Sequence, residues 1–331
     1  MGFLRRNGGG GGGAPLTRIF FATDIHGSER CFRKWLNAGR VYDANVMVLG
    51  GDITGKSLKP LCRVDGETWQ GEVGGRQVQA RDDEELQALC RQIADRGAYA
   101  RLSSPEEREE LARDPAAFER AFDEAIRERV EQWVALADER LKDSGIAAFA
   151  MLGNDDDEEL ADILRTSQSL TYAEDGIVEL PGGHEMVSLG YSTPTPWNTP
   201  RECSEEELAR RIGALARGLE RPEAAVMNLH CPPRDTNLDQ APQLDENLRP
   251  VVTAGGFAVM SVGAAAVRSA IEESGAALGL HGHVHESPAG QMIGTTMCVN
   301  PGSEYGEGIL RGAIVDLAED GTVKRWQITQ G

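Results

Sequence analysis

The segment TRIFFATDIHG (residues 17–27) decides the fold, because an apolar run ends abruptly in a polar loop. Residues 18–23 are predicted to form a buried strand that breaks at Asp24, and a helix is predicted over 29–38 with Ser28 as its N-cap. Two more buried strands are predicted over 45–50 and 146–152. Strands that alternate with helices and end in polar loops indicate a layered α/β fold.

About 95 residues separate the second and third of these strands. Residues 61–80 are predicted to form a hairpin unit, because turn signals occur at Asp65-Gly66 and Gly74-Gly75. Residues 82–143 are strongly charged and predicted to be helical. In the last part of this stretch an apolar residue recurs every four positions, which favours core packing of one helix face over any ligand role. The recurring residues are Phe118, Phe122, Ile126, Val130 and Val134.

The second half of the chain is predicted to be richer in short strands. They are placed near 177–180, 185–191, 224–229, 276–280, 296–299, 311–317 and 322–328. A helix over 204–219 begins at Ser204 with Glu207 three residues later, the pattern of a capping box. A second helix is predicted over 263–274.

The composition restricts the partners. The chain of 331 residues has 34 Lys and Arg against 53 Asp and Glu, a net charge of −19. This charge argues against a nucleic-acid backbone or an anionic membrane as an obligatory partner. Six scattered cysteines without a CxxC pair fit a reducing, cytoplasmic setting, and the glycine-rich segment 1–16 is predicted to be a disordered tail. Homo-oligomerisation is left open.

Polar residues that can act as metal ligands stand at five predicted strand ends. Each strand end supplies His, Asp or Asn, the nitrogen and oxygen ligands of which protein metal sites are built. Any one of these short patterns occurs by chance, but their succession along one chain does not. In chain order they are DIHG (24–27), GGD (50–52), GND (153–155), NLH (228–230) and GHVH (282–285).

This series resembles the calcineurin-like metallophosphoesterase superfamily, and in particular its small bacterial and archaeal branch. The segments HCPPRDTNLD (230–239), LHGHVHES (280–287) and CVNPGSEYGEG (298–308) also resemble that branch. The resemblance implies a four-layered αββα sandwich over 17–328, interrupted by a mainly helical insertion at about 56–145 that consists of a hairpin plus helices.

The resemblance also implies a set of metal ligands. One ion would be held by Asp24, His26, Asp52 and His285, and a second by Asp52, Asn154, His230 and His283. A carboxylate that bridges two divalent ions offsets their mutual repulsion, and Asp52 would fill this role. Manganese is the preferred metal, with iron and zinc as alternatives. The implied activity is hydrolysis of a small phosphomonoester or phosphodiester by in-line attack of a metal-bridging hydroxide.

One position departs from the superfamily pattern. The third block usually reads GNH, and here Asp155 stands in place of that histidine. Three interpretations are open: Asp155 orients His283 or His230, the role of acid passes to another histidine, with His281 as the candidate, or the leaving group needs no acid. The first and third are preferred together. The acidic residues 156–159 are expected to favour a helix N-terminus rather than to hold a metal.

Single residues argue against two other branches of the superfamily. The block GDITGK lacks the arginine of the protein-phosphatase branch, and Gly55 stands where purple acid phosphatases need a tyrosine. Arg234 is a speculative phosphate contact, whereas Asn300 and Ser303 are expected to shape a turn near the metals. The alternative functions are a non-catalytic scaffold or binding protein on the same fold and, less favoured, a hydrolase that acts on another kind of bond.

Overall fold

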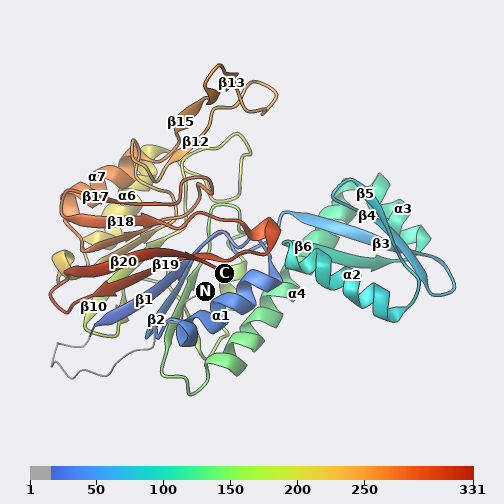
Figure 1. Ribbon diagram of the computed structural model, residues 1–331, viewed down its shortest axis with the longest axis horizontal. Coiled ribbons are helices and arrows are strands. Elements are labelled where there is room, and N and C mark those ends of the chain that lie inside the picture. Colours follow the sequence, from blue (N-terminus) through green and yellow to red (C-terminus); the bar gives the residue numbers. More distant parts are fainter. Residues whose placement is uncertain (1–15) are drawn as a thin grey trace.

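Two sheets of six strands each form the centre of the molecule (Figure 1). The computed structural model describes residues 16–331, so the predicted tail lies outside the described residues except for Leu16. The first sheet has the order β20 (Val323–Gln330), β19 (Arg311–Leu317), β1 (Thr17–Ala22), β2 (Val46–Gly50), β7 (Ala147–Met151) and β8 (Leu170–Tyr172). The second has the order β17 (Ala289–Ile293), β18 (Thr296–Asn300), β16 (Leu278–Leu280), β11 (Val226–Leu229), β10 (His184–Leu189) and β9 (Val178–Leu180).

The alternation of side chains along β1 shows how the sheets are packed. Ile19 and Phe21 point into a core between the two sheets, where they meet residues of the second sheet such as Leu280 and Val299. Phe20 and Ala22 belong to a different core on the opposite face of the same strand. A strand that is buried on both faces reads as a continuous apolar run, as the sequence of β1 does.

Helices cover the outer face of each sheet. Helices α1 (Glu29–Val41), α4 (Pro115–Leu141) and α5 (Leu160–Leu164) contribute to the core outside the first sheet. Helices α6 (Glu205–Ala216) and α7 (Ala265–Ser274) contribute to the core outside the second sheet. The predicted order of layers, helix, sheet, sheet and helix, is therefore confirmed. The predicted caps are present too, since Ser28 accepts from the Cys31 N–H and Ser204 from the Glu207 N–H.

The segment between β2 and β7 forms a lobe beside the two sheets (Figure 1). Its sheet has the order β5 (Arg76–Ala80), β4 (Thr68–Val73), β3 (Ser57–Asp65) and β6 (Ala98–Ser103), flanked by α2 (Asp83–Asp95) and α3 (Pro105–Arg113). The two predicted turns are confirmed, but the prediction that 82–143 is helical throughout was wrong at β6. This strand pairs in parallel with β3, a contact between distant segments that outweighs the local helical preference.

Helix α4 is shared by the lobe and the main body. Val130 and Val134 pack in the core outside the first sheet, whereas Phe118 and Phe122 pack against the lobe. Ile126 lies between them and contacts both groups. The predicted apolar stripe is thus a packing face, and it joins two hydrophobic cores rather than one.

Several short elements were not predicted. They are β8, β17, the 3-10 turns Pro222–Ala224 and Tyr305–Glu307, and an arm made of β12 (Gln240–Pro242), β13 (Val252–Thr253), β14 (Gly256–Phe257) and β15 (Val259–Ser261). The arm projects from the second sheet at the top of Figure 1. Among residues 16–331, every helix is too short or too polar to cross a membrane.

Candidate metal centre

The seven predicted ligands gather at one edge of the two sheets. They follow the parallel strands β1, β2 and β7 of the first sheet and β11 and β16 of the second. Because the carboxyl ends of parallel strands lie at the same edge of a sheet, residues far apart in the chain meet there. The residues are Asp24, His26, Asp52, Asn154, His230, His283 and His285.

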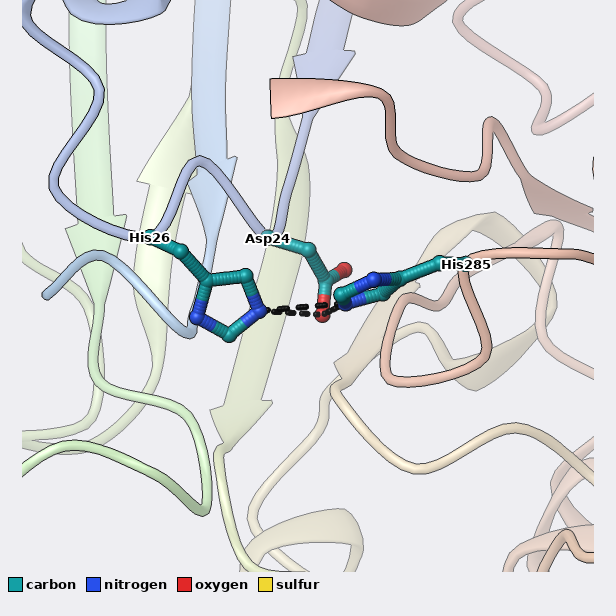
Figure 2. A group of neighbouring side chains, drawn as sticks. All are labelled: Asp24, His26 and His285. Carbon is teal, nitrogen blue, oxygen red and sulfur yellow. Dashed lines mark hydrogen bonds and ion pairs between the residues drawn. The ribbon is translucent and has the colours of Figure 1, made fainter. Parts of the chain in front are cut away.

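One group is formed by Asp24, His26 and His285 (Figure 2). The Nε2 atoms of the two histidines lie 3.0 Å apart. The Oδ1 atom of Asp24 is 3.3 Å from Nε2 of His285 and 4.0 Å from Nε2 of His26. Figure 2 shows that the two rings approach this carboxylate from opposite loops. Three potential ligand atoms thus converge on one point.

A second group is formed by Asp52, His230 and His283. The Nε2 atom of His230 lies 3.4 Å from Oδ1 of Asp52, and Nδ1 of His283 lies 2.7 Å from Oδ1 of Asn154. The other oxygen of Asp52, Oδ2, lies 3.7 Å from Nε2 of His26 in the first group. Asp52 therefore presents one oxygen to each group, as a bridging carboxylate would.

The backbone at this edge is strained. Asp24, His26, Asp52 and His283 have φ values of 53°, 38°, 48° and 66°, in the left-handed region that non-glycine residues rarely adopt. Such conformations persist only where the surrounding structure imposes them, and they cluster at functional sites. Four of the seven predicted ligands carry this signature, which supports a functional role for the whole group.

Glycines next to the ligands make the close approach of the loops feasible. A side chain at Gly153 would overlap the backbone N–H and the carboxylate of Asp52. A side chain at Gly282 would likewise overlap the carboxylate of Asp24. The glycines of GND and GHVH are thus required because two loops pack directly on carboxylates.

Burial and neighbouring charges shift the pKa values of the cluster in opposite directions. Burial disfavours a charged His230, but the carboxylates of Asp52 and Asp24 outweigh it and raise the pKa of His230 to about 10. Burial raises the pKa of each carboxylate, but His230 and neighbouring histidines outweigh it and hold both values below the usual range. Burial lowers the pKa of His26 to about 3, which leaves that ring neutral and able to coordinate a cation. The two carboxylates thus favour positive charge at this edge.

The residues present fit a pair of divalent metal ions. Nδ1 of His230 lies 2.8 Å from the Gly50 carbonyl, to which it donates, so its Nε2 atom faces Asp52 and would become a ligand when a metal ion displaces its proton. This Nε2 is buried and has no hydrogen-bond partner among the described residues. A backbone carbonyl that fixes the tautomer of a histidine in this way is the usual support of a metal ligand. The mixed imidazole, carboxylate and amide set suits manganese, iron or zinc.

The position of Asp156 contradicts the prediction that the acidic residues 156–159 only favour a helix N-terminus. It is fully buried and accepts hydrogen bonds from the N–H groups of Ile53, Thr54 and Gly153 at 2.7–3.0 Å and from the Thr54 hydroxyl at 2.6 Å. It therefore ties the loop that carries Asp52 to the loop that carries Asn154. Nothing in a run of acids distinguishes the buried one, so the sequence offered no signal for this role.

Asp155 lies between His26 and the second group, since its backbone N–H donates to Oδ1 of Asp52 at 3.0 Å. Its Oδ2 atom contacts the ammonium of Lys56 and lies 3.8 Å from Nδ1 of His26. Burial and the charge of Asp52 raise the pKa of Asp155 to about 6, against the opposing effect of Lys56. Its Oδ1 atom accepts from Nδ2 of Asn154 at 3.1 Å, and Oδ1 of Asn154 lies 2.7 Å from Nδ1 of His283, so Asp155 reaches His283 through Asn154 while its other oxygen faces His26 and Lys56. Neither Lys56 nor Tyr305, whose ring packs 4.7 Å from that of His26, was predicted.

The other residues that the sequence analysis singled out are not ligands of either group. His281 is fully buried with its Nδ1 atom 2.8 Å from the Leu229 carbonyl, and burial lowers its pKa to about 4, so its geometry does not support the acid role. Asn300 donates to the carbonyls of Gly282 and Val284, and Ser303 donates to the carbonyl of Asp24 at 2.6 Å. These two residues shape the loops around the cluster, as expected. Arg234 is exposed.

Thr199 holds the amide of Asn154 in place and provides a test of the site. Nδ2 of Asn154 donates to Oγ1 of Thr199 at 2.9 Å, and this hydroxyl donates to Glu202 at 2.8 Å. We expect Thr199→Val to weaken binding of one metal ion by about 10- to 100-fold, because the Asn154 amide loses one of the two acceptors, Thr199 and Asp155, that orient its Oδ1. Titration of the metal-free protein with Mn²⁺ in a calorimeter measures the change. The exposed Thr171→Val on β8 is the matched control, and equal affinities of the two variants would contradict this role.

Comparison with known proteins adds evidence on the fold. No family model matches the chain. The uncharacterized protein MJ1162 of Methanocaldococcus jannaschii is 30% identical over 118 residues, which span 35% of this chain and 47% of that protein, about half its length. One crystal structure is 14% identical with a TM-score of 0.55, and that of TT1561 of Thermus thermophilus is 12% identical with a TM-score of 0.52. Each match covers 96% of this chain and 99% of the other. The likeness over nearly the whole chain supports the observed fold, a sandwich of two sheets with helices on both outer faces.

Proposed function

We propose that this chain is a two-metal phosphoesterase that hydrolyses a small phosphomonoester or phosphodiester. The observation that carries the proposal is the convergence of seven predicted ligands from five loops into two neighbouring groups, with Asp52 of the second group also facing His26 of the first. When bound, two divalent ions would neutralise the phosphoryl oxygens and lower the pKa of a water molecule towards neutrality. A protein nucleophile is not needed for such chemistry.

The residues of the chain would position the ions and the substrate. Asp52 holds the two groups together, while the backbone N–H of Asp155 donates to its Oδ1 at 3.0 Å and fixes the orientation of the carboxylate. Asp24 is fixed in the same way by the N–H of His283 at 3.1 Å and by the Thr23 hydroxyl at 2.7 Å. Ligands held by several hydrogen bonds are preorganised, which is the main contribution of a protein to metal-assisted catalysis.

Removal and return of metal test the proposal. We expect the chelated protein to be inactive and the Mn²⁺-loaded protein to release nitrophenol from bis-(4-nitrophenyl) phosphate, because the chain supplies ligands but no nucleophile. Metal analysis should find about two ions per chain in the active form. A chain that binds two ions and hydrolyses neither this diester nor 4-nitrophenyl phosphate would instead favour the scaffold alternative. The preference for manganese and the cytoplasmic location stay predictions.

A further inference from the structure

Lys56 brings a positive charge to an otherwise acidic cluster. Among residues 16–331 it is the one Lys or Arg side chain that forms an ion pair with Asp24, Asp52 or Asp155, and its partner is Asp155. It follows the GGD block by four residues and lies directly before β3, the first strand of the lobe. Lys56 therefore reaches the site from the segment that joins the main body to the lobe.

The backbone that precedes Lys56 is fixed from two sides. The Gly55 N–H donates to the Tyr99 hydroxyl of β6 at 2.8 Å, so the lobe itself holds this loop. Thr54 donates its N–H and its hydroxyl to the buried carboxylate of Asp156. Because the backbone before Lys56 is held on both sides, the side chain of Lys56 can reach only a limited set of positions.

The exposure of the side chains identifies the open side of the cluster. The side chains of Asp24 and Asp52 are 1% and 4% exposed, those of Asp155 and His285 are 13% and 27% exposed, and that of Lys56 is 51% exposed. Solvent therefore reaches the cluster past Lys56, Asp155 and His285. A phosphate group that approaches the predicted metal ligands has to arrive by the same side.

We propose that Lys56, held in place by Asp155, binds the phosphate oxygens of the substrate, and that this pair takes the position of the histidine in the usual third block. The inference deepens the proposed function and rests on it. An ionised Asp155 alone would repel a phosphate, and the ammonium of Lys56 cancels that charge and adds three hydrogen-bond donors. Because half of the lysine side chain remains exposed, donors are free to reach a ligand while the ion pair persists.

Binding of inorganic phosphate to the Mn²⁺-loaded full-length chain tests the pair, with calorimetry as the readout. We expect Lys56→Ala to weaken phosphate binding by about 10- to 100-fold, the value of a charge-assisted hydrogen bond, with the content of metal unchanged. The control is Lys59→Ala on β3, which removes the same charge three residues further along the chain and should bind phosphate as the unmodified chain does. Circular dichroism establishes that both variants are folded.

The double variant separates a phosphate contact from simple neutralisation of Asp155. If Lys56 contacts phosphate, Lys56→Ala combined with Asp155→Asn binds phosphate at least about tenfold more weakly than Asp155→Asn alone. Equal affinity of these two variants would overturn the inference, as would a loaded chain that binds no phosphate. A chain that binds phosphate through Lys56 but hydrolyses no ester would refute the proposed function and leave this contact standing.

Discussion

Replacement of Asp52 with asparagine is expected to lower the proposed hydrolysis of a phosphodiester by at least about 1000-fold. Loss of a residue that merely supports a metal ligand already costs roughly 10- to 100-fold, and Asp52 is the carboxylate that faces both groups. An amide offers one neutral oxygen, so it can neither bridge two cations nor offset their repulsion. We expect the metal content to fall from about two ions per chain to one or none.

The measurement combines hydrolysis of bis-(4-nitrophenyl) phosphate with metal analysis of the same preparation. Asp157→Asn is the matched control, because Asp157 is exposed and belongs to the same acidic region, and it should retain full activity and both ions. Full metal content together with full activity in Asp52→Asn would contradict the assignment of the bridge. Circular dichroism distinguishes loss of metal from loss of the fold.

Replacement of Asp156 with asparagine is expected to destabilise the metal-free protein by roughly 1 to 6 kcal/mol. Oδ1 of Asp156 accepts from the N–H and hydroxyl of Thr54, and Oδ2 accepts from the N–H groups of Ile53 and Gly153. An asparagine amide turns two donors of its own towards one of these pairs. Both N–H groups of Ile53 and Gly153 then lose their acceptor, or the N–H of Thr54 alone does, because the Thr54 hydroxyl can rotate to accept. Each such loss costs about 1–3 kcal/mol.

Urea unfolding in the presence of a chelator measures this effect without any contribution from bound metal. The control Asp157→Asn should change the free energy of unfolding by less than about 0.5 kcal/mol, because its carboxylate is exposed. Equal stability of the two variants would show that Asp156 does not hold the loops of Asp52 and Asn154 together. The expected loss should also weaken metal binding, since the loops of Asp52 and Asn154 are released together.

The parts of the site that could be predicted are those set by local sequence. A buried strand followed by Asp-x-His or Gly-Asn places a candidate ligand at a strand end whatever the rest of the chain does, and the order of the five motifs then predicted the fold. The helix caps at Ser28 and Ser204 were predictable for the same reason, since each depends on a few consecutive residues.

The parts that could not be predicted depend on contacts between distant segments. Lys56 is a single lysine with no motif, and its meeting with Asp155 spans about 100 residues of sequence. Strand β6 has no alternation of its own and exists because it pairs with β3. Asp156 and Asp157 are equivalent in sequence, and only the packing of two loops buries the first and exposes the second.

Helix α4 has a consequence for the order in which the chain folds. Strands β2 and β7 are neighbours in the first sheet, but the whole lobe and α4 are synthesised between them. The pairing of β2 with β7 therefore cannot form on the ribosome until residue 151 has emerged, and the sheet is completed only by β19 and β20 near residue 330, whereas β3 to β6 can already pair. Contacts of such large sequence separation form slowly. We infer that the lobe folds first and that α4, with its C-terminal half still unpacked, provides the surface on which the main body then assembles.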